Sequence, residues 1–408
     1  MAKSCRSFFF ACGLFLEFKV SKAFLVLADG TVFEGTSIGA EGSTIGETVF
    51  TTGMTGYLET LTDPSYFGQI VTQTFPLIGN YGVIPEDFES RKCFVKGYIV
   101  RELCSLPSNF RCQSDLDSYL KSQNIVGIAE IDTRALTKKL RESGVMNGMI
   151  ISGIEKPVIE NSLLEKIKAY RVDQSVETVS TSTQLSEKQN VVKDYPEINH
   201  HIFHSDKKIR ILLWDFGAKY NIPRELEKRN AEVITVPYSY TADDILKLDP
   251  DGIMLSNGPG DPADNTGVIA EIAKLVQYNI DAQASGKKMV PIFGICLGHQ
   301  LLALARGCKT SKLKYGHRGG NHPVKEVETG RVFITSQNHG YAVQCDNLPS
   351  FAKLAFYNSN DKTCEGITYT DIPAFSVQFH PEACGGPHDT NFLFDKFIQN
   401  ILSAKESR

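Results

Sequence analysis

From Lys208 onward, the chain alternates short apolar runs with helical patterns, and this rhythm restricts its possible folds more than any other feature. Strands are predicted at 209–214, 232–237, 252–255 and 289–293, and helices at 222–229, 242–248, 267–278 and 297–305. Such alternation predicts an α/β fold with a doubly wound, mostly parallel sheet covered by helices on both faces. Ligands of these sheets bind beyond the carboxyl ends of the strands, so functional residues are expected there.

The first half of the chain has a different pattern. Residues 23–35 predict a hairpin because Asp29-Gly30 lies between two apolar runs, and 132–143 predicts a helix that ends at Gly144. Glycine and threonine are frequent in between, which indicates short strands and loops. The predicted organisation is a separate N-terminal α/β domain rich in short strands over 20–155, a connecting segment and polar linker over 156–207, and the doubly wound domain over 208–402.

Two segments are predicted to lie outside these domains. Residues 1–19 resemble a signal peptide, with Lys3 and Arg6 before an apolar stretch, but no small-residue cleavage site follows. They are interpreted as an extension of unknown role, with a start at Val20 as an alternative. The linker holds three histidines without a carboxylate or cysteine at ligand spacing, so they are interpreted as solvated rather than metal-binding: His200, His201 and His204.

Composition excludes several classes of protein. The 43 basic and 47 acidic side chains give a net charge of −4, which disfavours a nucleic-acid binder. No apolar run approaches the about 18 to 20 residues that cross a membrane. The ten cysteines are scattered, without a C-x-x-C pair, which disfavours zinc-ribbon and thioredoxin motifs. They are interpreted mainly as small core residues in a reducing compartment, so a cytoplasmic location is expected.

The sharpest local feature is Gly294-Ile-Cys296-Leu-Gly298, which follows a predicted strand and opens a predicted helix. This is the layout of a nucleophile elbow with cysteine as the nucleophile. The glycines permit the tight turn, and the helix N-terminus favours a thiolate. The alternative is a buried structural cysteine in a glycine turn.

A base and an orienting group follow the predicted strand 374–378. Residues two apart in an extended segment point the same way, so His380 and Glu382 can face one site. His380 is predicted to accept the proton of Cys296 and later to protonate the leaving amine, while Glu382 holds the imidazole.

Two other histidines compete for the role of base. His299 lies on the same helix as Cys296, has no evident orienting carboxylate, and is interpreted as a packing or supporting residue. His339 lies in 337–341, a turn-like segment after the predicted strand 332–335, and is expected to shape a pocket wall.

The oxyanion formed by thiolate attack needs preorganised donors. The backbone N–H of Leu297 is placed for this role by the elbow. A second donor can come from the glycine-rich loop 256–262, Ser-Asn-Gly-Pro-Gly-Asp-Pro, although the loop alone could be an ordinary turn.

These motifs together resemble those of class I, or triad, glutamine amidotransferases: the loop 256–262, Gly-Ile-Cys-Leu-Gly-His-Gln at 294–300, and His-Pro-Glu at 380–382. The first domain adds Thr-Gly-Met-Thr-Gly-Tyr at 52–57, Leu-Thr-Asp-Pro-Ser-Tyr at 61–66 and Ile-Ala-Glu-Ile-Asp-Thr-Arg at 128–134. With Gly-His-Arg-Gly-Gly-Asn-His-Pro at 316–323, these resemble the carbamoyl-phosphate synthetase small-chain family.

The resemblance implies a catalytic triad of Cys296, His380 and Glu382 that hydrolyses L-glutamine through a γ-glutamyl thioester. It implies no metal and the following glutamine-binding residues: Ser65, Gly258, Gly260, Leu297, Gln300, Asn338, Gly340 and Tyr341. It also implies a heterodimer, or a higher oligomer, in which ammonia passes to a large chain. That chain is expected to use ATP and Mg to make carbamoyl phosphate from bicarbonate, for pyrimidine or arginine biosynthesis.

The sequence itself is consistent with such a division of labour, because it holds no P-loop and no dinucleotide fingerprint. No cofactor is therefore expected in this chain. Two alternatives remain: another triad amidotransferase, such as the GMP or anthranilate synthase type, and a catalytically silent regulatory subunit. The first domain disfavours the former, and the intact triad residues disfavour the latter.

Overall fold

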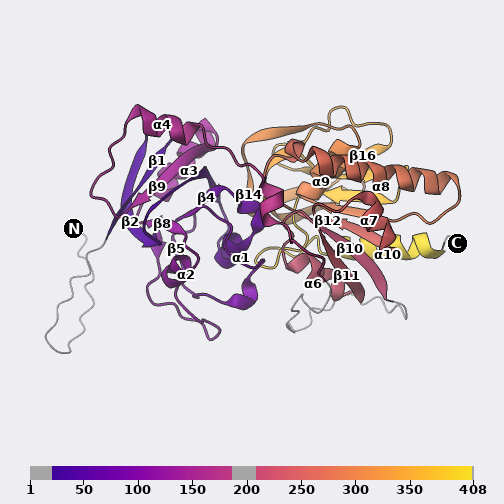
Figure 1. The fold of residues 1–408 in the computed structure, drawn as a ribbon, viewed down its shortest axis with the longest axis horizontal. Coiled ribbons are helices and arrows are strands. Elements are labelled where there is room, and N and C mark those ends of the chain that lie inside the picture. The colour runs from indigo at the N-terminus through magenta and orange to yellow at the C-terminus, as the bar shows by residue number, and fades with distance from the viewer. Residues whose placement is uncertain (1–20, 186–207, 407–408) are drawn as a thin grey trace.

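The structure is a computed structural model that describes residues 21–185 and 208–406 (Figure 1). The predictions for residues 1–19 and for the three linker histidines fall outside the described residues. Two bodies lie side by side along the long axis, one built from the first half of the chain and one from the second.

The first body is built around a closed barrel in the strand order β1-β2-β8-β6-β4-β3-β9. The predicted hairpin is confirmed, since β1 and β2 pair antiparallel with Leu25 opposite Phe33. The barrel strands are β1 (Lys22–Leu27), β2 (Val32–Gly39), β3 (Ser43–Thr51), β4 (Gln69–Gln73), β6 (Gly97–Ile99), β8 (Val126–Ala129) and β9 (Met146–Ser152), and a separate two-stranded pair is formed by β5 (Leu77–Ile78) and β7 (Glu102–Leu103).

Short helices surround the barrel. The predicted helix α3 (Thr133–Ser143) is confirmed: the Asp132 side chain accepts a hydrogen bond from the Ala135 N–H, and Gly144 ends the helix at a φ of 91°. The other elements are α1 (Tyr57–Thr62), η1 (Pro64–Tyr66), η2 (Pro85–Asp87), α2 (Leu116–Ser122), α4 (Asn161–Lys168) and α5 (Ser175–Val179). The last two belong to the segment predicted to connect the domains, and α4 packs on β9 through buried Ile167.

The second body contains a nine-stranded mixed sheet. Parallel pairing joins five neighbouring strands: β11 (Ala231–Pro237), β10 (Ile209–Asp215), β12 (Gly252–Leu255), β13 (Ile292–Ile295) and β18 (Ala374–Val377). The sheet continues through antiparallel strands: β17 (Cys364–Tyr369), β16 (Ala352–Asn358), β14 (Thr310–Glu326) and β15 (Val332–Val343). The predicted α/β fold class is confirmed; of the antiparallel extension, only residues 332–335 in β15 were predicted as strand.

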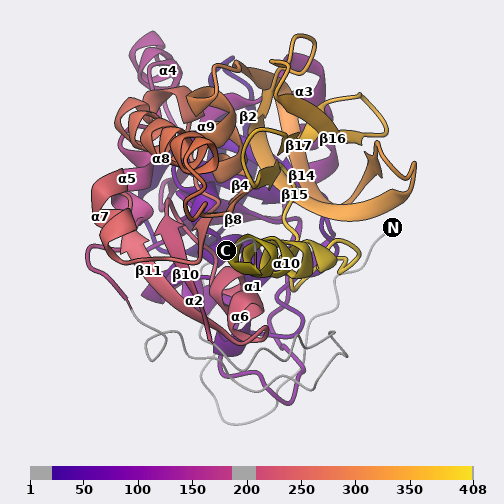
Figure 2. The same cartoon turned by 90° about the vertical axis from the view of Figure 1, so that its right-hand side faces the viewer.

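Helices cover both faces of the parallel strands (Figure 2). One face packs against α8 (Thr266–Ala284) and α9 (Leu297–Ala305), where Ile272 and Leu301 join the core residues of the strands. The other packs against α6 (Asn221–Glu227) and α10 (Phe392–Glu406), where Leu226 and Phe397 do the same. The parallel strands are therefore buried on both faces. The remaining helical elements of this body are α7 (Ala242–Lys247) and η4 (Pro262–Asp264).

Three local predictions need correction. The strand predicted at 289–293 lies at Ile292–Ile295, so β13 runs directly into the elbow, and the helix predicted at 267–278 extends to Ala284. The segment 337–341 is not a turn but part of β15. Its asparagine, histidine and glycine favour turns locally, but pairing with β14 keeps it extended.

Candidate active site

The elbow geometry places Cys296 at the junction of β13 and α9. Cys296 has a φ of 52° and a ψ of −102°, a strained conformation for a residue with a side chain. Side chains are sterically excluded on either side of it: a Cβ on Gly298 would overlap the carbonyl oxygen of Leu255, and one on Gly294 would lie 2.8 Å from the Gly298 carbonyl carbon. Both glycines of the motif are therefore required for the turn, while Cys296 itself is only 3% exposed.

The predicted base and its orienting group lie next to each other. His380 Nδ1 is 2.7 Å from Glu382 Oε1, and both side chains are almost fully buried. Lys219 Nζ donates to the same Glu382 oxygen from 2.8 Å. The Asn221 side-chain amide donates to the Glu382 backbone carbonyl, so both the backbone and the Oε1 atom of Glu382 are held in place.

These contacts set the charges of the pair. Burial and Lys219 lower the pKa of His380, but Glu382 and Cys296 outweigh them and raise it to about 9. Burial raises the pKa of Glu382, whereas Lys219 and His380 lower it to about 2. An imidazolium next to a carboxylate is therefore favoured at neutral pH. His380 Nε2 is buried without a partner at hydrogen-bond geometry, which leaves it free to exchange a proton with a bound molecule.

The sulfur faces a cavity of about 520 Å³ between the two bodies. Of the predicted glutamine-binding residues, all but Leu297 line it together with Cys296: Ser65, Gly258, Gly260, Gln300, Asn338, Gly340 and Tyr341. Leu297 follows Cys296 directly as the first residue of α9. Gln300 fixes one wall, because its Nε2 donates to the Tyr341 carbonyl from 2.7 Å.

Hydrogen bonds between the two bodies bring Ser65 to this cavity. Asp63 caps η1 by accepting from the Ser65 N–H, and its other oxygen accepts from Asn338 Nδ2 at 3.0 Å. Asn257 Nδ2 donates to Ser65 Oγ from 2.9 Å. The first body thus supplies part of the site rather than only its surroundings.

The roles of three further residues were not predicted from the sequence, although one of them, Asn257, lies in the predicted loop 256–262. Lys219 follows β10 and Asn257 follows β12, so both lie at the carboxyl edge of the sheet. Gln378 follows β18 two residues before His380, and its Nε2 donates to the Cys296 sulfur from 3.5 Å. The signal that could have found them is this shared edge, since the same argument identified Cys296 and His380.

His299 and His339, the two other candidates for the catalytic base, lie in environments that differ from that of His380. His299 Nδ1 is 2.8 Å from Ser376 Oγ, and burial lowers the pKa of His299 to about 3, so it stays neutral. His339 lines the cavity, as expected for a wall residue, and both its ring nitrogens contact neighbours on β15. Neither contacts Glu382. In the described residues, one group has metal-ligand geometry, and it lies outside the triad: His317, His339 and Glu365.

A second cavity of about 530 Å³ lies on the other side of His380. Its lining includes His380, Lys219, Glu89 and Cys384, and it shares Asn338 with the first cavity. Ser65 and Cys296 are absent from this lining. The triad therefore borders two cavities: Cys296 lines the first, and His380 lines the second.

Comparisons with known proteins agree with this two-part construction. Residues 25–150 match the family model "Carbamoyl-phosphate synthase small chain, CPSase domain", and residues 212–400 match "Glutamine amidotransferase class-I". A carbamoyl phosphate synthase small chain from Fusobacterium nucleatum is 50% identical over 92% of this chain and 97% of its own length. The chain belongs to the carbamoyl phosphate synthase small-chain family.

Other small chains match over similar lengths. Those of Clostridium perfringens and Listeria monocytogenes are each 48% identical, over 93% and 95% of this chain and 100% and 98% of their own lengths. Family membership therefore applies to both bodies. In the part of the chain that the structure describes, no helix is long and apolar enough to cross a membrane.

Proposed function

We propose that this small chain is the glutaminase subunit of a carbamoyl phosphate synthase. It hydrolyses L-glutamine at Cys296 and delivers ammonia to a large, ATP-using subunit. The observation that carries the proposal is the elbow cysteine, which faces a cavity of about 520 Å³ and interacts with a buried histidine that contacts a carboxylate and, through it, a lysine.

The first half-reaction forms a thioester. The imidazolium of His380 favours the negative sulfur, which attacks the side-chain carbonyl carbon of glutamine. The resulting oxyanion is stabilised by the backbone N–H groups of Leu297 and Gly258. Gly258 suits this role because a Cβ there would overlap the Phe216 carbonyl oxygen, so the backbone itself faces the cavity. The C–N bond then breaks as His380 Nε2 gives its proton to the leaving nitrogen, which departs as ammonia.

The second half-reaction releases glutamate. His380, now neutral, accepts a proton from water as the water oxygen attacks the thioester carbon. The C–S bond breaks, the sulfur regains its negative charge, and His380 is again an imidazolium. Glu382 stays ionised throughout and stabilises the imidazolium without taking its proton.

Ammonia needs protection after release, because water would protonate it and remove its nucleophilic lone pair. The second cavity, which begins at His380, supports an exit on the side away from the glutamine pocket. The large subunit would bind ATP and Mg and use the ammonia with bicarbonate, and the product would serve pyrimidine biosynthesis, arginine biosynthesis or both. A cytoplasmic heterodimer fits this role.

The test compares wild type with Cys296→Ser, each alone and with the large chain. Wild type should hydrolyse glutamine weakly alone and faster with partner and ATP, whereas the variant should lose glutamine-dependent synthesis yet retain synthesis from added ammonium. Cys308→Ser, just after the same helix, is the matched control and should behave as wild type. Glutamine-dependent synthesis that survives in Cys296→Ser would refute the proposal.

A further inference from the structure

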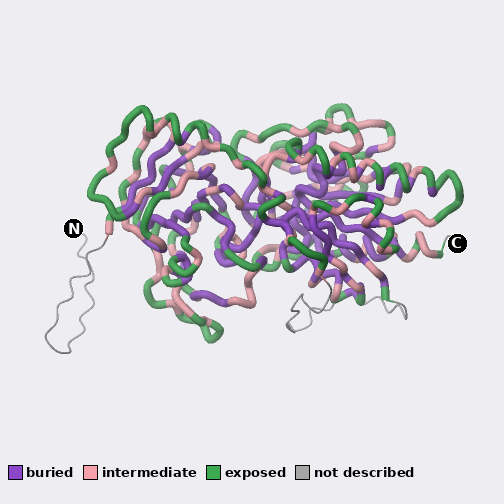
Figure 3. The backbone as a smooth tube through the Cα atoms, in the orientation of Figure 1, coloured by how far each residue is buried: buried purple, intermediate pink, exposed green. Residues whose placement is uncertain are grey.

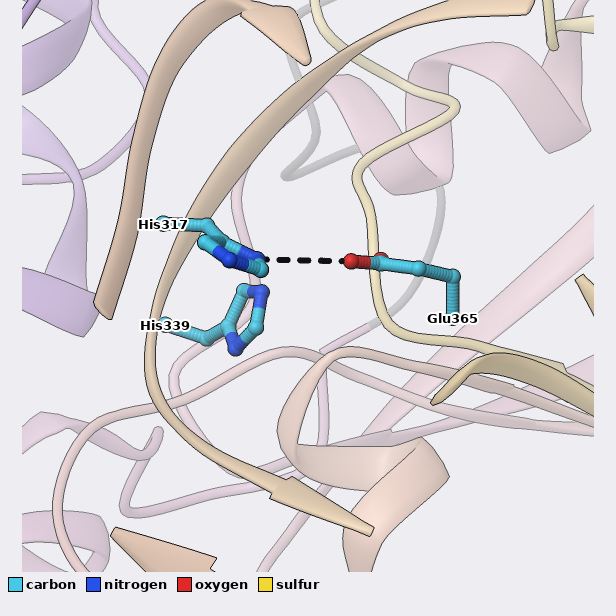
Figure 4. A group of neighbouring side chains, drawn as sticks. All are labelled: His317, His339 and Glu365. Carbon is cyan, nitrogen blue, oxygen red and sulfur yellow. Dashed lines mark ion pairs between the residues drawn. The ribbon is translucent and has the colours of Figure 1, made fainter. Parts of the chain in front are cut away.

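A group of three buried ligand-type side chains, drawn in Figure 4, lies at the wall of the glutamine cavity, and one of them, His339, lines it. His317 comes from β14, His339 from the opposite position on β15, and Glu365 from β17. One nitrogen or oxygen from each lies within 4.8 Å of the other two. In Figure 4 the Glu365 carboxylate points at the His317 ring, next to the His339 ring. The mechanism above uses neither His317 nor Glu365.

Polar atoms in this group lack hydrogen-bond partners, although His317 Nδ1 has a 3.4 Å ion-pair contact with Glu365 Oε1. His317 Nδ1 and Glu365 Oε2 are both buried without a hydrogen bond, and Glu365 is 0% exposed. A third unpartnered atom, His322 Nε2, belongs to a ring whose centroid is 5.2 Å from that of His317. Buried polar groups in folded proteins are nearly always satisfied, so several unpaired atoms at one place indicate a missing binding partner.

The spacing fits a metal ion better than a hydrogen bond. His317 Nδ1 and Glu365 Oε1 are 3.4 Å apart, long for a charged N–H···O contact. Two ligands each about 2.0 to 2.1 Å from a tetrahedral zinc ion are separated by about 3.3 Å. The observed separation is therefore close to that of two atoms bound to one ion.

The remaining ring nitrogens are held as in known metal sites. His317 Nε2 is 2.8 Å from Asp361 Oδ2, and His339 Nδ1 is 2.8 Å from the Tyr341 carbonyl oxygen. Ligating histidines usually donate their second N–H to a carboxylate or a backbone carbonyl, which fixes the tautomer and directs the other nitrogen at the metal. These contacts leave His317 Nδ1 as one ligand atom. His339 Nε2, which also lies 3.0 Å from Gln337 Oε1, is the other ring nitrogen that can face the ion.

We propose that His317, His339 and Glu365 bind a divalent transition metal of zinc-like preference. Gln337 Oε1, 3.0 Å from His339 Nε2, or a water completes the four ligands. Strand β15 also carries Asn338, Gly340 and Tyr341, so the ion would stabilise the cavity wall that these residues form. The proposal does not depend on the proposed reaction.

Metal content of the tag-free, full-length chain, alone and with its large chain, tests the proposal. Wild type purified without chelators should hold about one zinc per chain by elemental analysis. After chelation it should rebind zinc, and Glu365→Gln should weaken that affinity at least about 100-fold. Glu328→Gln, an exposed change on the loop between β14 and β15, is the matched control and should bind as wild type. Absence of saturable zinc binding in wild type, or equal binding by Glu365→Gln, would overturn the proposal.

A second measurement covers the case in which Glu365→Gln does not fold. Cobalt added to the chelated wild-type chain should give the intense visible absorption of a tetrahedral site, and one equivalent of zinc should abolish it. Weak octahedral absorption, or a signal that zinc does not displace, would contradict the site.

Discussion

Replacing Lys219 by methionine tests the electrostatics of the triad most sharply. The Lys219 ammonium is 2.8 Å from Glu382 Oε1, with side-chain exposures of only 10% and 0%. Methionine keeps much of the volume and removes the charge. Glu382 would then be buried with His380 as its main charged partner. The methionine side chain would carry no charge and would fill much of the space that a water molecule would need.

The magnitude follows from the pKa of Glu382. Burial would raise this pKa, yet Lys219 and His380 hold it at about 2 instead of 4.5. At about 1.4 kcal/mol per pH unit, the native surroundings favour the ionised form by about 3 kcal/mol. Removing one partner of a buried pair typically costs about 3 to 5 kcal/mol, so Lys219→Met should lower the free energy of unfolding by about 3 kcal/mol at pH 7.

The assay is urea unfolding of the full-length chain between pH 2 and 7. A carboxylate with a depressed native pKa stabilises the fold above its unfolded pKa of about 4.5, and the contribution disappears as the pH falls towards 2. The difference between wild type and Lys219→Met should therefore shrink over that range. Lys247→Met removes an exposed lysine with a 3.4 Å contact and should leave the unfolding free energy unchanged. A loss below about 1 kcal/mol for Lys219→Met, or a difference independent of pH, would refute the reasoning.

Three further predictions concern the elbow, the substrate pocket and the base. Gly298→Ala should lower the free energy of unfolding by about 1 to 3 kcal/mol, measured with denaturant, and abolish glutaminase activity, because the new Cβ would overlap the Leu255 carbonyl oxygen of β12. Gly267→Ala, in α8 with open space around it, is the control and should leave stability unchanged or slightly higher. Equal effects of the two substitutions would contradict the steric argument. Ser65→Ala should raise KM for glutamine about 5- to 10-fold in steady-state assays. The Ser65 hydroxyl accepts from Asn257 and can donate its own proton to glutamine, and that hydrogen bond would be worth about 1 kcal/mol, whereas an unchanged KM would remove this residue from the pocket. Glutaminase activity should fall above about pH 9 as His380 loses its proton. Glu382→Gln should lower the rate by about 10⁴-fold and shift this alkaline loss of activity to lower pH. An unchanged pH profile in the variant would contradict the pairing of His380 with Glu382.

The strand-helix rhythm of the second half predicted much of its fold, because buried parallel strands and their covering helices have strong local signatures. β10, β12 and α9 lie where the pattern placed them. Of the antiparallel strands, only residues 332–335 of β15 were predicted; β14 and β16 are partly exposed and interrupted by bulges, which weakens the strand pattern. The extended conformation of residues 337–341 depends on a partner strand distant in sequence, which local residue preferences do not record.

The site could be predicted where chemistry and chain position coincide. Cys296 and His380 each follow a strand and carry reactive groups, so their meeting at one edge was foreseeable. Ser65 could be assigned only through family resemblance, because it reaches the cavity by way of contacts between the two bodies. Lys219 was missed because a lone lysine after a strand is usually solvated, and only the fold shows it buried against Glu382.

The central claim is that Cys296 forms a covalent γ-glutamyl thioester. Intact-protein mass spectrometry of the full-length chain, quenched in acid during turnover of glutamine, tests it most directly. We predict an added mass of one glutamyl group, located on the peptide containing Cys296, sensitive to hydroxylamine and missing in Cys296→Ser. Turnover without any adduct on wild type, or an adduct that persists in Cys296→Ser, would contradict the account.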